Sequence, residues 1–537
     1  MKPACKRNKP RQVRIERAKL ALALIVGLLC GCSAVAAQVT PAPAAQKTQK
    51  KKDELWHTEG LPPDAVFRYG STERNPRAIG VYALRFSADG KLLVIRDKRQ
   101  SIRVLDLEKR ELVAVLPTQS VLDYVVTPDN KQVIVGNRKK VQVWSIAEAE
   151  IKREFEAEAY KLAMASEPDE LVTVGKGVVN RYRWPLPSKP NVIRSKLSGA
   201  TVLASGVSKD GKFAIFHNGS TCEVLDTVEG KPVLPAPKVV PKKALISPNS
   251  HLLAEMNYGD SRMKVFDLRN ARKYQFSLKD KRRVVTAAFS NDSRFLYSSN
   301  YDNSIVIWDL VTMQSVARVA GHKSRIYALA ADPSRLFCLT SGTSSSLDRS
   351  VLYWDFRNRL FPPIKDVDGA KEFALDDVWK ELGSDDATDS LAATNRLYRA
   401  LQNDPEVAEK TTARLGIDQV ADDSRAAKYV KDLDDPKYDV REKATVMLKS
   451  MVERIRPMLE RQLADCSQEA KWRIQRILRT DKLRPEVLTA DGRRGHRIIL
   501  ALELCGNESA IDALNRIARH SKNQTMVDLA KDAIDRL

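Results

Sequence analysis

The chain has 537 residues, which exceeds what one compact core usually holds, so we expect two or three domains. Its 43% hydrophobic and 29% charged residues are typical of a soluble globular protein and exclude a membrane-embedded or disordered chain. The net charge of +22 lies outside residues 364–537, which hold 31 Lys and Arg against 33 Asp and Glu. This excess either favours acidic or anionic partners or forms a solvated basic surface.

The first 37 residues have the layout of a secretory signal. Eight Lys and Arg precede an apolar run from Leu20 to Cys30, and small residues follow as far as Ala37. The run of 11 apolar residues is shorter than the about 20 that span a bilayer. We therefore predict a signal peptide over residues 1–37 and export to the periplasm or cell envelope.

The end of this segment permits three outcomes. "Leu29-Cys30-Gly31-Cys32" resembles the bacterial lipobox, and the resemblance implies a lipoprotein acylated at Cys32, although Cys30 is an unusual residue at its position. Ordinary signal cleavage after the small residues near Ala36 or Ala37 is the second outcome. An uncleaved anchor, with the apolar run extended to Ala37, is the third.

Residues 38–60 combine Pro, Ala, Gln and Lys without an apolar period, which predicts a flexible tether or a plain linker. The run Lys50-Lys51-Lys52 lies within it. An acyl chain beside a Lys cluster strengthens binding to an anionic leaflet, so we expect the membrane surface as a partner.

A repeat of about 40 residues follows the tether. One marker is a polar turn with residues that tolerate tight-turn dihedrals, and the other is a strand that ends on an aromatic residue or Leu. The turns centre on Asp89, Asp129, Asp169, Asp210, Asn249, Asp292 and Pro333, and the strands end on Leu105-Asp106, Trp144-Ser145, Trp184-Pro185, Leu225-Asp226, Phe266-Asp267, Trp308-Asp309 and Trp354-Asp355. Seven units of four short strands predict an all-β seven-bladed β-propeller over residues 61–363.

The repeat resembles the WD40 family, most clearly in "AAFSNDSRFLYSSNYDNSIVIWDL" and in the unit that begins Gly321-His322. The resemblance implies a hydrogen-bonded set within the last blade, and not an active site. Its members here are His322, Thr340 or Ser341, Asp348 and Trp354. In the sixth unit, "SIVIWD" has no polar face, so we expect this third strand to be buried between the two neighbouring blades. Residues Asp64 to Tyr69 should supply the outer strand of the last blade, which otherwise lacks one.

Beyond Pro363 the apolar period becomes helical, which predicts an all-α domain over residues 364–537. The segment from Asp432 to Leu448 resembles the turn and second helix of a HEAT repeat, with Asp439, Val440 and Arg441 at the helix start. The other helices fit this pattern by period alone. A HEAT-like helical-repeat domain and an unrelated helical bundle are both compatible with the sequence.

No arrangement of residues indicates a reaction. The six histidines form no metal-binding pattern, and GxSxG, GxxxxGK[ST] and GxGxxG motifs do not occur. We therefore predict no catalytic residue, no cofactor and no metal.

The sequence predicts a non-enzymatic scaffold that binds other proteins outside the cytoplasm on the bacterial cell envelope. Two alternatives stay open: a binder of anionic lipid or polyanion through the basic propeller, and an enzyme of unknown reaction on a propeller face. We expect no nucleic-acid partner, because that role conflicts with export.

Overall fold

The structure is a computed structural model. It describes residues 55–71, 80–166, 169–185, 189–197, 203–218, 222–234, 243–256, 261–268, 276–280, 282–343, 348–363, 373–415, 423–450, 452–463, 466–481, 489–521 and 523–537. The predicted signal at residues 1–37, the acylation candidate Cys32 and Lys50-Lys51-Lys52 lie outside the described residues, so their roles stay predictions.

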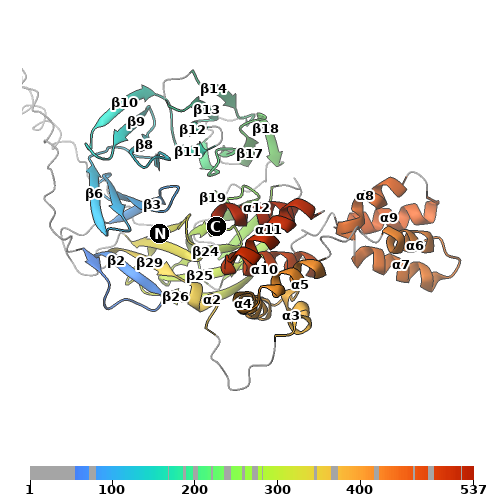
Figure 1. The fold of residues 1–537 in the computed structure, drawn as a ribbon. Helices are drawn as coiled ribbons and strands as arrows, with labels where there is room; N and C mark the ends of the chain where they lie inside the picture. Colours follow the sequence, from blue (N-terminus) through green and yellow to red (C-terminus); the bar gives the residue numbers. More distant parts are fainter. Residues whose placement is uncertain are drawn as a thin grey trace, which may run out of the picture. The chain divides into compact units, whose positions relative to one another are not determined.

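The described strands form seven antiparallel sheets arranged in a ring, as Figure 1 shows, which confirms the predicted seven-bladed propeller. Blades one to three contain β3 (Val81–Phe86), β4 (Leu92–Asp97), β5 (Ile102–Asp106), β6 (Glu111–Leu116), β7 (Asp123–Val126), β8 (Gln132–Gly136), β9 (Lys140–Ser145), β10 (Ile151–Glu156), β11 (Lys161–Ser166), β12 (Asp169–Val174), β13 (Val178–Arg183) and β14 (Asn191–Arg194). Blades four to six contain β15 (Leu203–Val207), β16 (Phe213–His217), β17 (Cys222–Asp226), β18 (Lys231–Leu234), β19 (Lys243–Ile246), β20 (Leu252–Met256), β21 (Arg262–Asp267), β22 (Phe276–Lys279), β23 (Val284–Phe289), β24 (Phe295–Asn300), β25 (Ser304–Asp309) and β26 (Gln314–Ala320).

Blade seven closes the ring with a strand from the beginning of the fold. It combines β27 (Ile326–Ala331), β28 (Cys338–Thr343) and β29 (Arg349–Asp355) with β2 (Ala65–Ser71) and β1 (Trp56–His57). The pairing of β2 with β29 confirms the predicted closure. Strand β1 falls within the range predicted as a tether, and the Trp56 ring packs 5.0 Å from Phe67 and 5.1 Å from Tyr69. Ordered structure therefore begins before residue 61.

The 40-residue repeat has a local cause in the turn between the first two strands of a blade. In blade one, Leu92 donates its backbone N–H to Ser87 Oγ at 2.9 Å, and the Ser87 hydroxyl donates to Asp89 at 2.6 Å. The same pair of bonds recurs in the turns that begin at Thr127, Ser208 and Ser290. A short polar side chain that bonds the backbone within its own turn fixes the reversal in the same way in each of these blades.

Strand β25 shows where the propeller core lies. All six of its residues are buried. Ile305 and Ile307 pack in a cluster with residues of blade seven, whereas Val306 and Trp308 pack in a cluster with residues of blade five. Because side chains alternate across a strand, the two faces of this blade are covered by its two neighbours, as predicted.

The described part of the C-terminal region contains eleven helices, α2 to α12, which Figure 1 labels. They are α2 (Arg357–Leu360), α3 (Leu375–Leu382), α4 (Ala387–Asn403), α5 (Glu406–Arg414), α6 (Asp423–Asp432), α7 (Tyr438–Ser450), α8 (Val452–Gln462), α9 (Gln468–Asp481), α10 (Ala490–Cys505), α11 (Glu508–His520) and α12 (Gln524–Arg536). Several of these helices have a side chain that caps the N-terminus. For example, Thr489 Oγ1 accepts a hydrogen bond from the Gly492 N–H at the start of α10.

These helices have two separate cores where the sequence predicted one domain. Residues of α3, α4, α5, α10, α11 and α12 share one apolar cluster, which we call the docked helical module. Residues of α6 to α9 form another cluster, which we call the inserted bundle. The inserted bundle therefore interrupts the docked helical module in chain order. Helical periodicity predicts that a helix has an apolar face, but it does not specify which helix covers that face.

Candidate functional site

The predicted set in blade seven forms a chain of hydrogen bonds. His322 Nδ1 lies 3.0 Å from Asp348 Oδ2, and His322 Nε2 lies 2.7 Å from Ser341 Oγ. The Trp354 indole N–H donates to the same Ser341 oxygen at 2.8 Å. Of the two candidates that the sequence left open, Ser341 joins this chain, whereas the Thr340 hydroxyl donates to the Ala330 carbonyl at 3.2 Å.

The surroundings of Asp348 lower its pKa. Burial alone would raise its pKa, but hydrogen bonds from His322, the Ser350 hydroxyl and the Lys323 amide outweigh burial and hold the pKa below its usual value. The side chains of His322 and Asp348 are completely buried, so a substrate has no access to them. The arrangement joins β28 and β29 to Asp348, which directly precedes β29, and to the loop before β27, which is a structural role.

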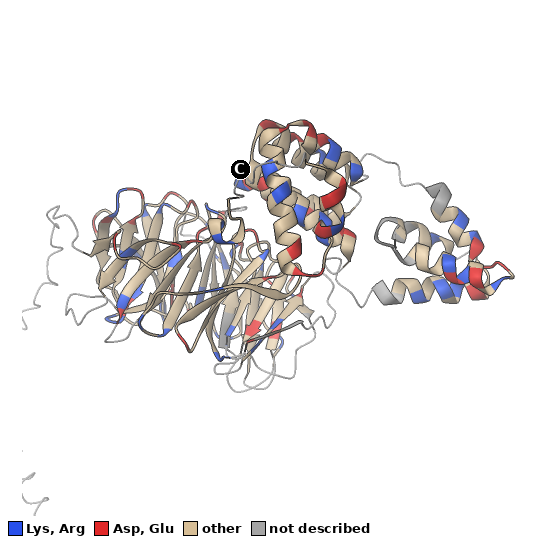
Figure 2. Ribbon diagram, turned by 90° about the horizontal axis from the view of Figure 1, so that it is seen from below, with Lys and Arg blue, Asp and Glu red and all other residues tan. Residues whose placement is uncertain are grey.

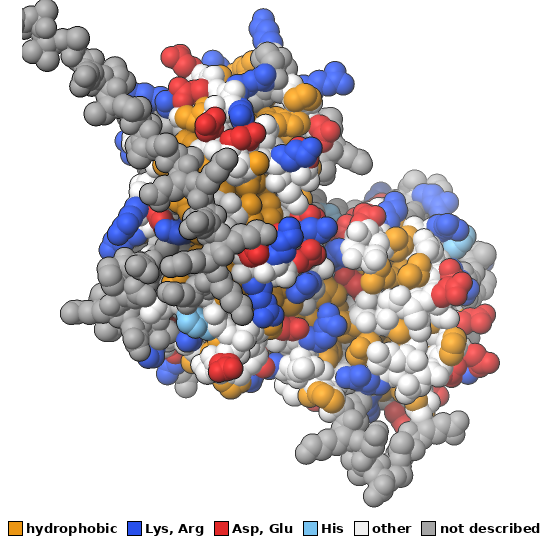
Figure 3. All heavy atoms as spheres, turned by 60° about the vertical axis from the view of Figure 1, so that its left-hand side comes forward, with side chains coloured by type: hydrophobic (Ala, Val, Ile, Leu, Met, Phe, Trp, Pro, Cys, Tyr) orange, Lys and Arg blue, Asp and Glu red, His pale blue; other side chains and the backbone are white. Residues whose placement is uncertain are grey.

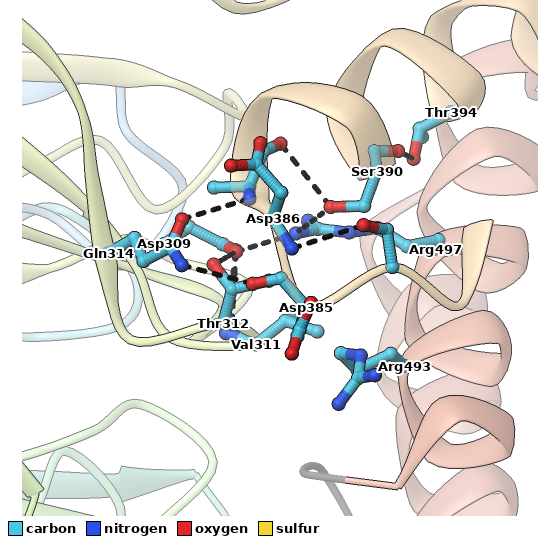
Figure 4. Close-up of polar contacts among 12 residues, drawn as sticks. Asp309, Val311, Thr312, Gln314, Asp385, Asp386, Ser390, Thr394, Arg493 and Arg497 are labelled. Atoms are coloured by element: carbon cyan, nitrogen blue, oxygen red, sulfur yellow. Dashed lines mark hydrogen bonds and ion pairs between the residues drawn. The ribbon is translucent and has the colours of Figure 1, made fainter. Parts of the chain in front are cut away.

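A buried joint connects blade six to the docked helical module (Figure 4). Arg497 of α10 donates from Nη2 to Asp309 Oδ2 at 2.5 Å and to the Ser390 hydroxyl of α4 at 3.0 Å. Asp309 also accepts from the Thr312 amide at 3.0 Å, which holds its carboxylate in the turn after β25. Gln314 completes the joint by donating to the Asp385 carbonyl and accepting from the Ala387 N–H, each at 3.0 Å. The aspartate of the Trp308-Asp309 pair therefore binds a helix.

A second buried ion cluster lies at the same boundary. Arg294, in the turn before β24, donates from Nη1 to Glu503 Oε2 of α10 at 2.7 Å, and it also pairs with Asp292 at 3.2 Å. Arg536 of α12 donates from Nε to Glu503 Oε1 at 2.6 Å. Arg294 and Glu503 side chains are each 1% exposed. Buried charges of this kind are tolerated only when they are paired. The propeller and the docked helical module therefore supply counter-charges to each other.

Apolar side chains fill the rest of this boundary. Phe295, Phe337 and Phe361 belong to one buried cluster with Leu391 of α4 and Leu500 of α10. None of these contacts was predicted from the sequence. The one available signal was the uncommon Arg497 and Glu503 within an otherwise apolar stretch of α10, since charges at buried helix positions require a partner.

An arc of basic turns lies at one end of blades one to three. We call it the basic arc and define it as Lys98 and Arg99 between β4 and β5, Arg138 and Lys139 between β8 and β9, and Lys176 between β12 and β13. All five residues are exposed, and none makes an ion pair within the described ranges. The turns occupy equivalent positions in three consecutive blades, so they lie at the same end of the propeller. Figures 2 and 3 show Lys and Arg interspersed with Asp and Glu over the described parts of the molecule in view.

The predicted HEAT-like residues lie at the start of α7. Asp439 is in the first helical turn and is exposed, and Val440 is partly buried. Arg441 donates from Nη1 to the Asp435 carbonyl at 2.7 Å and to the Pro436 carbonyl at 3.0 Å. Arg441 therefore closes the turn between α6 and α7, and the HEAT resemblance itself stays a prediction.

Within the described ranges, no three His, Cys, Asp or Glu side chains are placed together to hold a metal ion. The same residues include no helix with the length and apolarity that a membrane crossing needs.

Comparison with known proteins agrees with the class that this geometry defines. The family model of the WD domain, G-beta repeat, matches residues 272–309 and 313–355, which contain β22 to β25 and β26 to β29. The protein therefore has WD40 repeats in a seven-bladed β-propeller, followed by a helical region.

Two individual proteins show the similarity. Cell division control protein 4 of Saccharomyces cerevisiae is 32% identical over 69 residues, which are 13% of this chain and 8% of the length of that protein. The β-propeller domain of Cps50 (Swd1) from Myceliophteria thermophila is 14% identical, with a TM-score of 0.42, and the match covers 52% of this chain and 97% of that domain.

Proposed function

We propose that the protein is a non-enzymatic scaffold for protein–protein interaction, displayed outside the cytoplasm on the bacterial cell envelope. The observation that carries this proposal is the buried joint, in which Arg497 and Asp309 connect the propeller to the docked helical module. A joint of this kind combines two interaction surfaces in one chain, which suits a protein that holds partners together. The hydrogen-bonded set of His322, Ser341, Asp348 and Trp354 is buried in blade seven and has no access to substrate.

Export and acylation at Cys32 form the second part of the proposal. The basic and apolar N-terminal layout supports it. Mass measurement of the mature N-terminus tests it directly. A diacylglyceryl Cys32 is expected, whereas an N-terminus at Ala37 or Gln38 would show ordinary cleavage and remove the lipid anchor.

Crosslinking in intact cells, followed by pulldown from envelope fractions and mass spectrometry, tests the scaffold function. We expect defined proteins to be enriched over a control pulldown from cells that lack the tagged chain. The Asp309→Ala variant, assayed at a temperature where circular dichroism shows it to be folded, should lose those partners that require both domains. If the wild-type chain enriches no protein, the scaffold function is wrong.

The second candidate function is binding to an anionic surface through the basic arc. Five exposed cations without ion pairs in the described structure favour it, because each is available to an external anion. Two probes distinguish the sources of anionic groups: vesicles that contain phosphatidylglycerol present lipid headgroups, and polyphosphate presents a soluble polyanion. Vesicles of phosphatidylcholine are the control.

We expect binding to weaken as salt increases, because exposed charges are screened. Charge reversal by Arg138→Glu with Lys139→Glu should weaken it strongly. The matched control is Lys91→Glu with Arg110→Glu, two exposed cations in turns at the other end of blade one that make no ion pair within the described residues. Equal loss in both variants would show that net charge alone causes the binding and would contradict a site at the basic arc.

A further inference from the structure

The inserted bundle has no part in the core of the docked helical module. Helices α5 and α10 contribute to one apolar cluster although α6 to α9 come between them in the chain, and these four helices bury their own side chains together. The docked helical module therefore does not need the inserted bundle to complete its packing. A separate function of the inserted bundle would explain its surface, which differs from that of an ordinary solvated helix.

Helices α7 and α9 share one polar contact region. Arg473 of α9 donates from Nη1 to Glu442 Oε1 at 2.8 Å and to Thr445 Oγ1 at 3.1 Å, both on α7. Glu469 of α9 accepts from Arg473 Nε at 2.7 Å and lies 3.8 Å from Arg441 Nε. These contacts place the outward sides of the two helices next to each other.

Large apolar side chains flank this region and remain exposed. Tyr438 and Val446 of α7 are 61% exposed, and Trp472 of α9 is 53% exposed. The guanidinium carbon of Arg441 lies 5.8 Å from the centre of the Tyr438 ring, and that of Arg476 lies 5.4 Å from the Trp472 ring. Exposed Trp, Tyr and Arg are the residues that contribute most to binding at protein interfaces, whereas a solvated helix seldom exposes them together.

The same surface has an excess of positive charge. Residues 437–446 and 468–476 contain six Lys and Arg against three Asp and Glu. Two of the three carboxylates, Glu442 and Glu469, already pair with Arg473. Lys443 and Lys471 are exposed and make no ion pair in the described part of the chain. An acidic partner would therefore find unpaired cations here, and a basic partner would not find free carboxylates in equal number.

We propose that the α7–α9 face, defined by Tyr438, Glu442, Val446, Glu469, Trp472 and Arg476, docks a protein segment that presents apolar side chains flanked by carboxylates. Apolar groups of the segment cover Trp472 and Tyr438, and its carboxylates pair with the cations at the edges of the face. The proposal rests on the scaffold function and assigns one of its partner sites to the inserted bundle.

Three fluorescein-labelled peptides test the proposal with the full chain. The first has Leu at helical spacing with Glu at the remaining positions, the second replaces every Glu by Lys, and the third scrambles the first. Fluorescence anisotropy measures the dissociation constants. We expect the acidic amphipathic peptide to bind more tightly than the other two, because only this peptide matches both the apolar side chains and the charge.

Variants then locate the site. Trp472→Ala and Arg476→Glu should each weaken binding of the acidic peptide by about tenfold or more, as expected for a hot-spot residue. Tyr82→Ala is the matched control, because Tyr82 is 44% exposed and also lies under an arginine, with the Arg96 guanidinium carbon 5.7 Å from its ring. An unchanged circular dichroism spectrum and melting temperature show that each variant is folded.

Equal binding of the acidic and basic peptides, or unchanged affinity in Trp472→Ala, would overturn the proposal. Dissociation of an oligomer on Trp472→Ala, measured as a lower molar mass of the particle in solution, would also overturn it. That result would assign the face to a second copy of the protein. None of these outcomes affects the scaffold function, which fails only if the wild-type chain enriches no partner from envelope fractions.

Discussion

Arg497 of α10 donates to the carboxylate of Asp309 in blade six at 2.5 Å, and neither side chain reaches solvent. The two residues are 188 positions apart in the sequence. This pair makes the end of the Trp308-Asp309 strand a docking point for the docked helical module.

Loss of the Asp309 carboxylate should destabilise the protein severely. Asp309→Ala leaves the Arg497 guanidinium buried without its counter-charge, which costs about 3–5 kcal/mol of unfolding free energy. Denaturant titration measures the change. Glu154→Ala is the control, because the Glu154–Lys140 pair is about 40% exposed on both sides and exposed ion pairs contribute little to stability. Similar losses in the two variants would contradict a structural role for the joint.

Closure of the ring by β2 predicts a second large effect. The Tyr69 ring is fully buried at the contact between β2 and β29. Tyr69→Ala should lower the unfolding free energy by about 3–5 kcal/mol, as for other large buried aromatic side chains. The exposed neighbour Val66, changed to Ala, provides the control. Thermal unfolding followed by circular dichroism compares them, and equal melting temperatures would contradict closure through β2.

The hydrogen-bond chain of blade seven predicts unequal effects for two adjacent residues. Ser341→Ala removes the oxygen that Trp354 and His322 both contact, so it leaves two buried polar groups without this partner. We expect a loss of about 2–4 kcal/mol, since each orphaned group costs about 1–3 kcal/mol. Thr340→Val replaces one hydroxyl by a methyl group of similar shape and should lower the unfolding free energy by about 1 kcal/mol. Chemical denaturation distinguishes them, and a larger effect for Thr340→Val would reverse the assignment.

Glu255 of β20 should make stability depend on pH. Burial raises its pKa to about 7, and the nearby Lys264 only partly offsets this effect. A folded-state pKa above the unfolded value of about 4.3 means that folding binds a proton, so stability falls as pH rises from about 4 to about 7 and stays lower above that range.

The Glu255→Gln variant removes this proton linkage. It should be more stable than wild type at pH 8, by about 4 kcal/mol at most, and should match wild type near pH 4. Denaturation across this pH range measures the difference. Glu229→Gln, at a residue with a 64% exposed side chain, should keep the wild-type pH profile. If the stability of Glu255→Gln has the same pH dependence as that of wild type, the Glu255 carboxyl does not cause this dependence.

The sequence by itself determined the parts of this protein that depend on local contacts. Ser87 and Asp89 fix their turn through bonds within five residues, and the repetition of such turns makes seven blades readable without a structure. Closure by β2 was also predictable, because the last unit lacked an outer strand and only Asp64 to Tyr69 had the composition to supply it.

Only the tertiary structure decided which distant elements contact each other. The sequence shows that α5 and α10 have apolar faces, but the shared core across the inserted bundle follows from packing. Likewise, Asp309 ends its strand like other strand ends in the repeat, and its role depends on Arg497, which α10 brings to it. Long-range pairing has this character because any apolar face or charge has many possible partners along the chain, and the selection is made by the packing of the whole fold.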